Sequence, residues 1–283
     1  MRSLLFVPGD SPRKFDKASA SEADALVLDL EDSVVPAGKI DARTSVRSML
    51  ISGAPGKSLW VRINPLDSEW AMGDLAAVVG AEPFGIILPK CRSGEDVRRL
   101  AHYLDALETQ ARLAVGSLRI LIIATELGEA MFNLGSYAGV SERLWGITWG
   151  AEDIAADLGA LSNRAQQQYT APYVLARSLC LYAAASARIL AYDTPCIALD
   201  DPGLLETECQ EARRDGFVGK IAIHPKHVPA INMAFTPSEA ERLWARKVLA
   251  GFEAHPGAGT FRLEGQMIDR PHYRAARRIL NMG

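Results

Sequence analysis

Residues 118–159 read LRILIIATELGEAMFNLGSYAGVSERLWGITWGAEDIAADLG, and they decide which fold the chain is expected to adopt. Two short apolar runs, residues 118–124 and 144–149, are bounded by turn residues, a pattern typical of buried strands. Residues 129–132 and 140–143 lie between the runs and predict a helix and a connection. The stretch therefore predicts two successive parallel strands.

An acid follows each of these predicted strands. Glu126 follows the first and Asp153 the second, so both should lie at the edge of the sheet where α/β folds place their ligands. Two carboxylates form a hard-oxygen site suited to Mg²⁺, which takes one or two protein carboxylates and fills its other positions with water and substrate. Acids are also common in the first turn of a helix, where the helix dipole favours them. The residues alone leave both interpretations open.

The composition excludes several classes of protein. At 283 residues the chain has room for one large α/β domain or two small ones, and its net charge of −3 gives no basic footprint for nucleic acid. No apolar run approaches the roughly 18 residues of a membrane helix, and the N-terminal strand pattern stops at Pro8, too early for a signal peptide. The four cysteines show no paired spacing, so we expect reduced thiols in a cytoplasmic protein.

Strand and helix alternate along the rest of the chain. Ser11 is expected to cap a first helix that starts at Pro12, and a helix with a clear apolar face is expected around residues 97–107. Eight strands are predicted, over residues 3–7, 25–28, 58–63, 85–88, 118–124, 144–149, 188–192 and 220–223. Eight such units favour a (β/α)8 TIM barrel over residues 1–235, with a doubly wound sheet as the alternative. The dinucleotide-binding version of that sheet loses support because no G-x-G-x-x-G follows the first strand.

Residues 236–283 do not fit the repeat. Thr236-Pro237-Ser238-Glu239 predicts a capping box, with a helix running to about Phe252, and a short helix is expected after Pro271. We expect a C-terminal helical extension that serves as an appendage or lid, or that contacts a neighbouring subunit.

Charged side chains end most of the predicted strands. They are Asp29, Arg62, Lys90, Glu126, Asp153, Asp193 and His224. Polar groups in such places are satisfied by one another or by a ligand. The set mixes acids for a metal with cations for an anionic substrate, and it lacks both a nucleophile elbow and zinc-ligand spacing. Metal-assisted chemistry on a carboxylate-bearing substrate is therefore favoured over acyl-enzyme chemistry.

Several of these stretches also resemble the citrate lyase beta-subunit family, within the aldolase superfamily that includes malyl-CoA and citramalyl-CoA lyases. The similar stretches follow one another over nearly the whole chain: LFVPG (5–9), VLDLEDSV (27–34), VRIN (61–64), LPK (88–90), TE (125–126), GAEDIAADLG (150–159), GFVGKIAIHP (216–225) and GQMID (265–269).

The resemblance implies roles for individual residues. Glu126 and Asp153 match the family's Mg²⁺ ligands, and Arg62 matches the arginine that holds the substrate carboxylate or developing enolate, so these three are the expected substrate-binding set. Asp269 matches an acid that acts across a subunit boundary on the acetyl-CoA methyl proton, which makes Arg62 and Asp269 the expected catalytic pair. Glu31 and Asp32 match acids near the metal, with helix capping as the plainer interpretation. Lys90 is either a carboxylate partner or a structural residue, and His224 is expected to be a buried, hydrogen-bonded histidine outside the catalytic set.

The activity that the resemblance implies is Mg²⁺-dependent carbon–carbon cleavage. A 3-hydroxyacyl-CoA thioester of the malyl-CoA or citramalyl-CoA type would give a 2-oxo acid and acetyl-CoA, or the reverse condensation would run. Three alternatives stay open: a thioester hydrolase on the same scaffold, a citrate lyase beta subunit that acts with an acyl carrier protein, and a non-catalytic dicarboxylate binder. Relatives are commonly trimers, so a homotrimer without nucleic-acid or membrane partners is expected.

Two positions depart from the family pattern. Leu127 stands where many relatives carry threonine, and residues 194–198 read TPCIA where relatives often have an aromatic residue and a further acid. The second departure borders the expected pocket, so the resemblance does not extend to the exact substrate.

Overall fold

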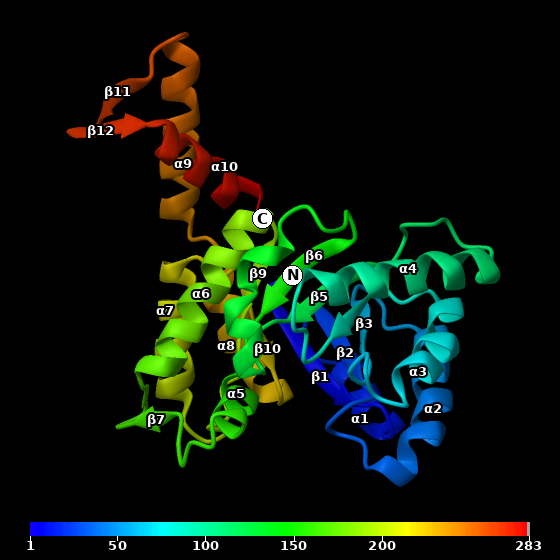
Figure 1. Ribbon diagram of the computed structural model, residues 1–283. Helices are drawn as coiled ribbons and strands as arrows, with labels where there is room; N and C mark the ends of the chain where they lie inside the picture. The colour runs from blue at the N-terminus through cyan, green and yellow to red at the C-terminus, as the bar shows by residue number, and fades with distance from the viewer. Residues whose placement is uncertain (282–283) are drawn as a thin grey trace. The chain divides into compact units, whose positions relative to one another are not determined.

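A computed structural model describes residues 1–281, which fall into two compact units, Met1–Asn232 and the residues from Met233 onward. In the first unit eight parallel strands close into a barrel, in the order β1-β10-β9-β6-β5-β4-β3-β2 (Figure 1). They are β1 (Ser3–Pro8), β2 (Ala25–Asp29), β3 (Ser58–Arg62), β4 (Gly85–Leu88), β5 (Arg119–Ile123), β6 (Leu144–Thr148), β9 (Leu190–Asp193) and β10 (Gly219–Ala222). Because β1 pairs with both β2 and β10, the sheet has no edge. The TIM-barrel prediction is confirmed, and the doubly wound alternative is excluded.

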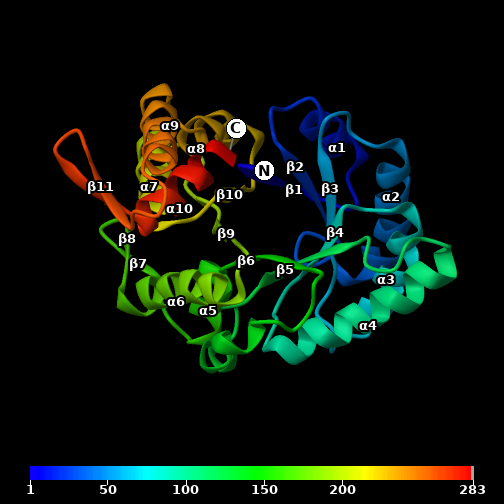
Figure 2. The same cartoon turned by 90° about the horizontal axis from the view of Figure 1, so that it is seen from above.

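Helices surround the barrel (Figure 2). They are α1 (Pro12–Ser19), α2 (Lys39–Ser52), α3 (Ala71–Val78), α4 (Gly94–Ala111), α5 (Ala151–Asp157), α6 (Ala171–Ala187), α7 (Pro202–Asp215) and α8 (Val228–Phe235). Ser11 occupies the N-cap position of α1, but its side chain makes no capping hydrogen bond. A short hairpin, β7 (Arg164–Ala165) and β8 (Gln168–Tyr169), lies between α5 and α6.

The connection between β5 and β6 differs from the expected helix. It contains only two 3-10 turns, Gly128–Phe132 and Leu134–Tyr137. Glycine at 128, 135 and 139 makes a longer helix unfavourable here, because each glycine costs about 1 kcal/mol relative to alanine in a helix. Leu134 and Tyr137 are nevertheless buried, so the turns stay packed.

The barrel interior is filled by apolar side chains from most of its strands. Leu4, Val27, Trp60, Ile87 and Leu121 belong to one cluster and are almost fully buried. Burying a large aliphatic or aromatic side chain stabilises the fold by about 1.5–3 kcal/mol. Gly85 makes room for the indole, since a Cβ there would lie 2.5 Å from the Trp60 ring. This core fixes the strand register and thereby places the charged strand ends together at one mouth.

All four cysteines (Cys91, Cys180, Cys196 and Cys209) are free and buried. Within residues 1–281 there is no helix that combines the length and the apolarity needed to cross a bilayer.

The second unit contains α9 (Glu239–Ala254), the antiparallel hairpin β11 (Thr260–Leu263) and β12 (Gln266–Asp269), and α10 (Arg270–Asn281). The capping box of α9 joins Ser238 and Glu241, two residues beyond the pair expected from sequence. Glu264 and Gly265 both have positive φ, 49° and 86°, as a two-residue I′ hairpin loop requires. Ala245, Val248, Ile268 and Ala276 form a small core of its own.

Candidate functional site

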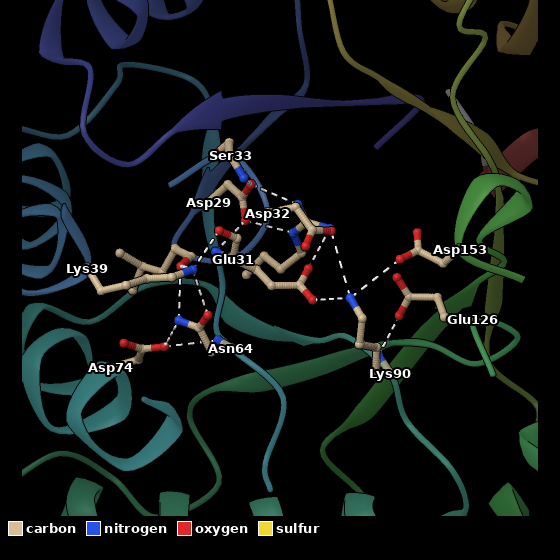
Figure 3. A network of polar contacts seen from close by, with 12 residues as sticks. Asp29, Glu31, Asp32, Ser33, Lys39, Asn64, Asp74, Lys90, Glu126 and Asp153 are labelled. Carbon is tan, nitrogen blue, oxygen red and sulfur yellow. Dashed lines mark hydrogen bonds and ion pairs between the residues drawn. The ribbon is translucent and has the colours of Figure 1, made fainter. Parts of the chain in front are cut away.

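The charged strand ends on one side of the barrel mouth form a single polar network (Figure 3). We call this set the mouth cluster: Asp29, Glu31, Asp32, Arg62, Lys90, Glu126 and Asp153. Asp29 and Arg62 are the last residues of β2 and β3, and the others lie in the loops or the first helical turn that follow β2, β4, β5 and β6. The closed barrel therefore brings residues from five successive strands together.

Arg62 is held in one orientation by a forked ion pair. Its Nε and Nη2 each donate to an Asp29 carboxylate oxygen at 2.7 Å, and its guanidinium lies 4.7 Å from the centre of the Phe6 ring. A planar guanidinium suits such two-point binding better than an ammonium would. Nη1 lies 2.8 Å from Glu31 Oε2. Because a guanidinium carries five N–H groups, N–H donors on the Nη atoms of Arg62 remain available to a ligand in the cavity that this residue lines.

Asp29 also shapes the loop that follows it. Its Oδ1 accepts from the Glu31 amide at 2.9 Å, and its Oδ2 accepts from the Ser33 amide at 3.1 Å. These bonds set the start of the loop and direct Glu31 inward, where it is buried. Asp32 points outward and its side chain is 58% exposed.

Lys90, for which the sequence leaves open a role as a carboxylate partner or as a structural residue, bridges the two halves of the network. Its backbone N–H donates to Glu126, and its ammonium donates to Glu31 and lies 3.4 Å from Asp153 Oδ1 (Figure 3). The residue has φ 49°, a left-handed conformation that costs a non-glycine residue about 1–3 kcal/mol. That strain aims both the amide and the side chain at carboxylates.

The loop that contains Glu126 is held to both ends of α5. The Gly150 amide donates to Thr125 Oγ1 at 3.2 Å, and the Gly128 amide donates to Asp157 Oδ2 at 2.6 Å. Glu126 packs so closely on Gly150 that a Cβ there would lie 2.6 Å from its Cγ. Asp153 stands in the first turn of α5, so it is a dipole-favoured helix acid and a site acid at once. Sequence reasoning did not single out Gly150 or Asp157; the glycine directly after an apolar strand was the available signal.

Negative charge is in excess in the mouth cluster, where five acids face two cations. Burial, Asp153 and Glu31 together raise the pKa of Glu126 well above its ordinary value. Burial, with a smaller contribution from Asp32, raises the pKa of Glu31 to about 7 despite its two cationic neighbours. The buried Glu31 carboxylate is paired with both cations, through Arg62 Nη1 at 2.8 Å and through Lys90 Nζ. Acids that outnumber their cationic partners in this way fit a divalent cation of the hard, oxygen-seeking kind.

A cavity of about 130 Å³ opens beside these acids. It is lined by Phe6, Arg62, Ile87, Ile123, Glu126, Thr148, Trp149, Gly150, Ala151, Glu152, Asp153, Thr194, Pro195, Ile221 and Ile223. Acids and a guanidinium occupy one part of this lining, and aliphatic and aromatic side chains make up most of the rest. Such a site can hold a small anionic molecule against a metal ion.

Two other residues predicted at strand ends, Asp193 and His224, lie outside the mouth cluster. Asp193 is buried and bound to Lys220 Nζ at 2.7 Å, and it does not belong to the cavity lining. The expectation of a buried His224 is wrong: the residue is exposed, and its Nδ1 accepts from the Lys226 amide because the chain turns there into a 3-10 helix. Asp269 belongs to the second unit, directly precedes α10, and has its Oδ1 2.5 Å from His272 Nδ1.

Comparison with known proteins identifies the relatives of this chain. A family model described as HpcH/HpaI aldolase/citrate lyase matches residues 2–225. The citrate lyase subunit beta-like protein of Deinococcus radiodurans is 34% identical over 99% of this chain and 96% of its own length. A (3S)-malyl-CoA thioesterase of Cereibacter sphaeroides is 33% identical over 99% of this chain and 93% of its own.

Solved structures indicate the same family. CitE from Mycobacterium tuberculosis, in a crystal structure with magnesium, acetoacetate and coenzyme A, is 31% identical and covers 99% of this chain and 97% of its own, with a TM-score of 0.78. The family match extends over most of the barrel and over the whole mouth cluster. The chain belongs to the HpcH/HpaI aldolase/citrate lyase family.

Proposed function

We propose that the chain is a Mg²⁺-dependent carbon–carbon lyase that acts on a 3-hydroxyacyl-CoA thioester of the malyl-CoA or citramalyl-CoA type. The products are a 2-oxo acid and acetyl-CoA, and the reverse condensation uses the same site. The observation that carries the proposal is the excess of buried acid beside Arg62 in a small cavity at the barrel mouth. The related CitE, whose crystal structure contains magnesium, acetoacetate and coenzyme A, supports it.

Glu126 and Asp153 are the proposed ligands of Mg²⁺, with Glu31 and Asp32 as nearby acids. When bound, the ion supplies a divalent charge that favours the ionised form of the substrate hydroxyl. The Lys90 amide holds Glu126, and the Thr125–Gly150 contact fixes the position of the adjacent loop. The protein's part is thus to hold two carboxylates in place at the mouth of the barrel.

Cleavage breaks the bond between the hydroxyl-bearing carbon and the carbon next to the thioester carbonyl. The hydroxyl gives its proton to solvent water and becomes the oxo group, while the electron pair of the broken bond moves into the thioester and forms an enolate. The Nη edge of Arg62 offers N–H donors to that developing negative charge or to the substrate carboxylate. Asp269 is the proposed acid that returns a proton to the enolate carbon.

We further propose that Asp269 acts on a neighbouring subunit of a cytoplasmic homo-oligomer, a trimer by resemblance. In this arrangement residues 1–235 are the catalytic domain and residues 236–283 are an extension that contacts the neighbour. Mixing inactive Arg62→Ala and Asp269→Ala chains tests the arrangement. Activity should return in mixed oligomers if the two residues come from different chains, and it should stay absent if they come from the same chain.

A thioester hydrolase is the second candidate, and the 33% identity to a (3S)-malyl-CoA thioesterase favours it. A panel of malyl-, citramalyl- and citryl-CoA with Mg²⁺, assayed for both carbonyl and free thiol, decides between the two. Carbonyl release with acetyl-CoA supports the lyase, and free thiol with an intact hydroxy acid supports the hydrolase.

The same panel addresses the two remaining alternatives. Turnover only with an acyl carrier protein indicates a citrate lyase beta subunit. Binding of Mg²⁺ and dicarboxylate without any turnover indicates a non-catalytic binder. Equal activity in EDTA would contradict the role of the metal.

A further inference from the structure

Thr148, the last residue of β6, points into the barrel. Its partners in the parallel register are Ile123 of β5 and Tyr192 of β9, which both belong to the apolar cluster of the barrel interior. Residues paired across neighbouring strands project from the same face of a sheet, so Thr148 lies in the same layer. It lines the cavity and is 3% exposed. A hydroxyl therefore stands in a layer that is otherwise apolar at this point.

The fold does not use this hydroxyl. Thr148 Oγ1 has no hydrogen-bond partner in residues 1–281, and no other described residue of the cavity lining carries a buried, unpaired polar atom. Burying a polar group without a partner is unfavourable, and such groups are rare. Valine has the same branched shape and suits a strand as well, without this cost. A residue that breaks the rule inside a cavity is expected to meet a ligand there.

Thr148 and Arg62 approach the cavity from different sides. In the ring of strands, β5 and β4 separate β6, which carries Thr148, from β3, which ends in Arg62. Glu126 lies just beyond the end of β5, and Asp153 lies just beyond the end of β6. A small ligand held at these two acids through a metal ion therefore has a guanidinium on one side and a hydroxyl on the other.

The two donors suit different parts of the proposed substrate. A carboxylate has about four lone-pair sites, of which a metal ion takes only some, and the neighbouring acids Glu126 and Asp153 offer it no hydrogen bond. The hydroxyl of Thr148 can donate one. The thioester half gains a full negative charge as it becomes an enolate, and a cation stabilises that charge better than a neutral hydroxyl does.

We infer that Thr148 is a substrate-binding residue whose hydroxyl donates a hydrogen bond to the carboxylate of the oxo-acid half, while Arg62 binds the enolate. The inference rests on the proposed function and deepens it, because it decides between the two roles that were open to Arg62.

The first test measures binding of pyruvate, as a small 2-oxo acid, to the Mg²⁺-loaded full chain by isothermal titration calorimetry. Thr148→Val removes only the hydroxyl and should weaken binding by about 10–100-fold, as for loss of a hydrogen bond to a charged group. Thr148→Ser keeps the hydroxyl and should stay within about 3-fold of the wild type. Thr207→Val, which removes an exposed hydroxyl bound to the Gly203 carbonyl, is the matched control and should bind like the wild type.

Urea unfolding of the ligand-free protein separates this role from a structural one. Because the hydroxyl is buried and unpaired, the unfolding midpoint of Thr148→Val should equal or exceed that of the wild type. Weaker pyruvate binding together with a lower midpoint would show that the hydroxyl supports the fold, and it would overturn the inference.

Kinetics with malyl-CoA and citramalyl-CoA test the division of roles. Thr148→Val should raise KM with kcat within about 3-fold of the wild type, because the carboxylate contact is equal in the ground state and the transition state. Arg62→Lys should instead lower kcat, because it loses donors to a charge that develops during the reaction. A fall in kcat for Thr148→Val as large as for Arg62→Lys would contradict this division.

Three further results would overturn the role of Thr148. They are pyruvate binding by Thr148→Val that equals the wild type, as when a water molecule satisfies the hydroxyl, a loss in Thr148→Ser as large as in Thr148→Val, and no pyruvate binding by the wild type. Assays on the same samples keep the two proposals apart. The expected order of pyruvate affinities without cleavage of any ester contradicts only the lyase function, whereas cleavage with unchanged pyruvate binding in Thr148→Val contradicts only the role of Thr148.

Discussion

Two buried charge clusters flank the barrel strands, and they differ in balance. The mouth cluster holds five acids and two cations. A second group, which we call the closed cluster, lies around β9, β10 and α7 and contains Asp193, Glu208, Asp215, Arg164, Arg177 and Lys220. It has three acids and three cations, and Lys220 Nζ lies 2.7 Å from Asp193 and 3.0 Å from Glu208.

The pKa of Asp193 in the closed cluster and that of Glu126 in the mouth cluster shift in opposite directions. In the closed cluster burial alone would raise the pKa of Asp193, but Lys220 and Arg177 outweigh burial and hold the pKa below its ordinary value. In the mouth cluster burial and neighbouring acids raise the pKa of Glu126. In a cluster that stabilises the fold, acids and cations balance one another. A cluster at the sheet edge that has too few cations is suited to binding a positively charged ligand. The predictions below test this contrast.

The largest effect on stability is expected in the closed cluster. Asp193→Asn leaves Lys220 and Arg177 short of their counter-charge, and removing one partner of a buried ion pair typically costs about 3–5 kcal/mol. Urea unfolding of the wild type and the variant measures the loss. Asp200→Asn, which breaks a pair whose acid is 96% exposed, is the control and should change the free energy of unfolding by less than about 1 kcal/mol. A loss no larger than in the control would show that the closed cluster does not stabilise the fold.

Glu126→Gln should have opposite effects on activity and on stability. The rate of carbon–carbon cleavage should fall by about 10²–10³-fold, as for loss of a group that stabilises transition-state charge. Without metal, the variant should be more stable than the wild type. The raised pKa of Glu126 in the wild type shows that the fold disfavours the ionised acid, and glutamine carries no charge. Steady-state kinetics and urea unfolding in EDTA measure both, with the exposed Glu129→Gln as control. Lower stability in EDTA would contradict the idea of excess negative charge.

The pH dependence of stability should reveal Glu31. Folded Glu31 keeps its proton up to about pH 7, whereas the unfolded chain releases it near the ordinary value of 4.5. Rising pH through this window therefore ionises a group that the fold disfavours, and the free energy of unfolding of the metal-free protein should fall, on the order of 2–3 kcal/mol. Unfolding of the wild type and Glu31→Gln between pH 4.5 and 7.5 checks this. The variant should lack most of the fall, and identical pH profiles would refute the assignment.

A smaller effect is expected at the clamp between the Glu126 loop and α5. Asp157→Ala removes the acceptor of the Gly128 amide and should weaken Mg²⁺ binding by about 10-fold, as loss of a group that orients a ligand does. Asp157→Asn keeps an oxygen acceptor and should stay within about 3-fold of the wild type, since its carbonyl can replace the carboxylate oxygen. Calorimetric titration of both variants measures the difference. Equal affinity in all three proteins would show that the clamp does not position the site.

The sequence predicted the barrel and which residues belong to the mouth cluster. It did not predict how the side chains of the mouth cluster contact one another. Apolar runs followed by a charged residue indicated the positions of β2 to β6 and of the site residues at their ends. This worked because hydrophobic periodicity and turn residues are properties of the local sequence. The strain at Lys90 and the fit of Glu126 on Gly150 depend on which loops the closed barrel brings together. Asp193 and His224 follow strands in the same way as the site residues, yet one pairs inward with Lys220 and the other turns outward. The hairpin of residues 260–269 was missed because its strands are mostly exposed and contain no continuous apolar run.

The most direct test of the charge contrast is calorimetric titration of Mg²⁺ into the wild type and into Asp153→Asn, with circular dichroism to verify that both are folded. The account predicts one ion bound per wild-type chain and none in the variant over the same concentration range. Equal stoichiometry and affinity in the two proteins would contradict the account, because the acids of the mouth cluster would then not be the ones that hold the ion.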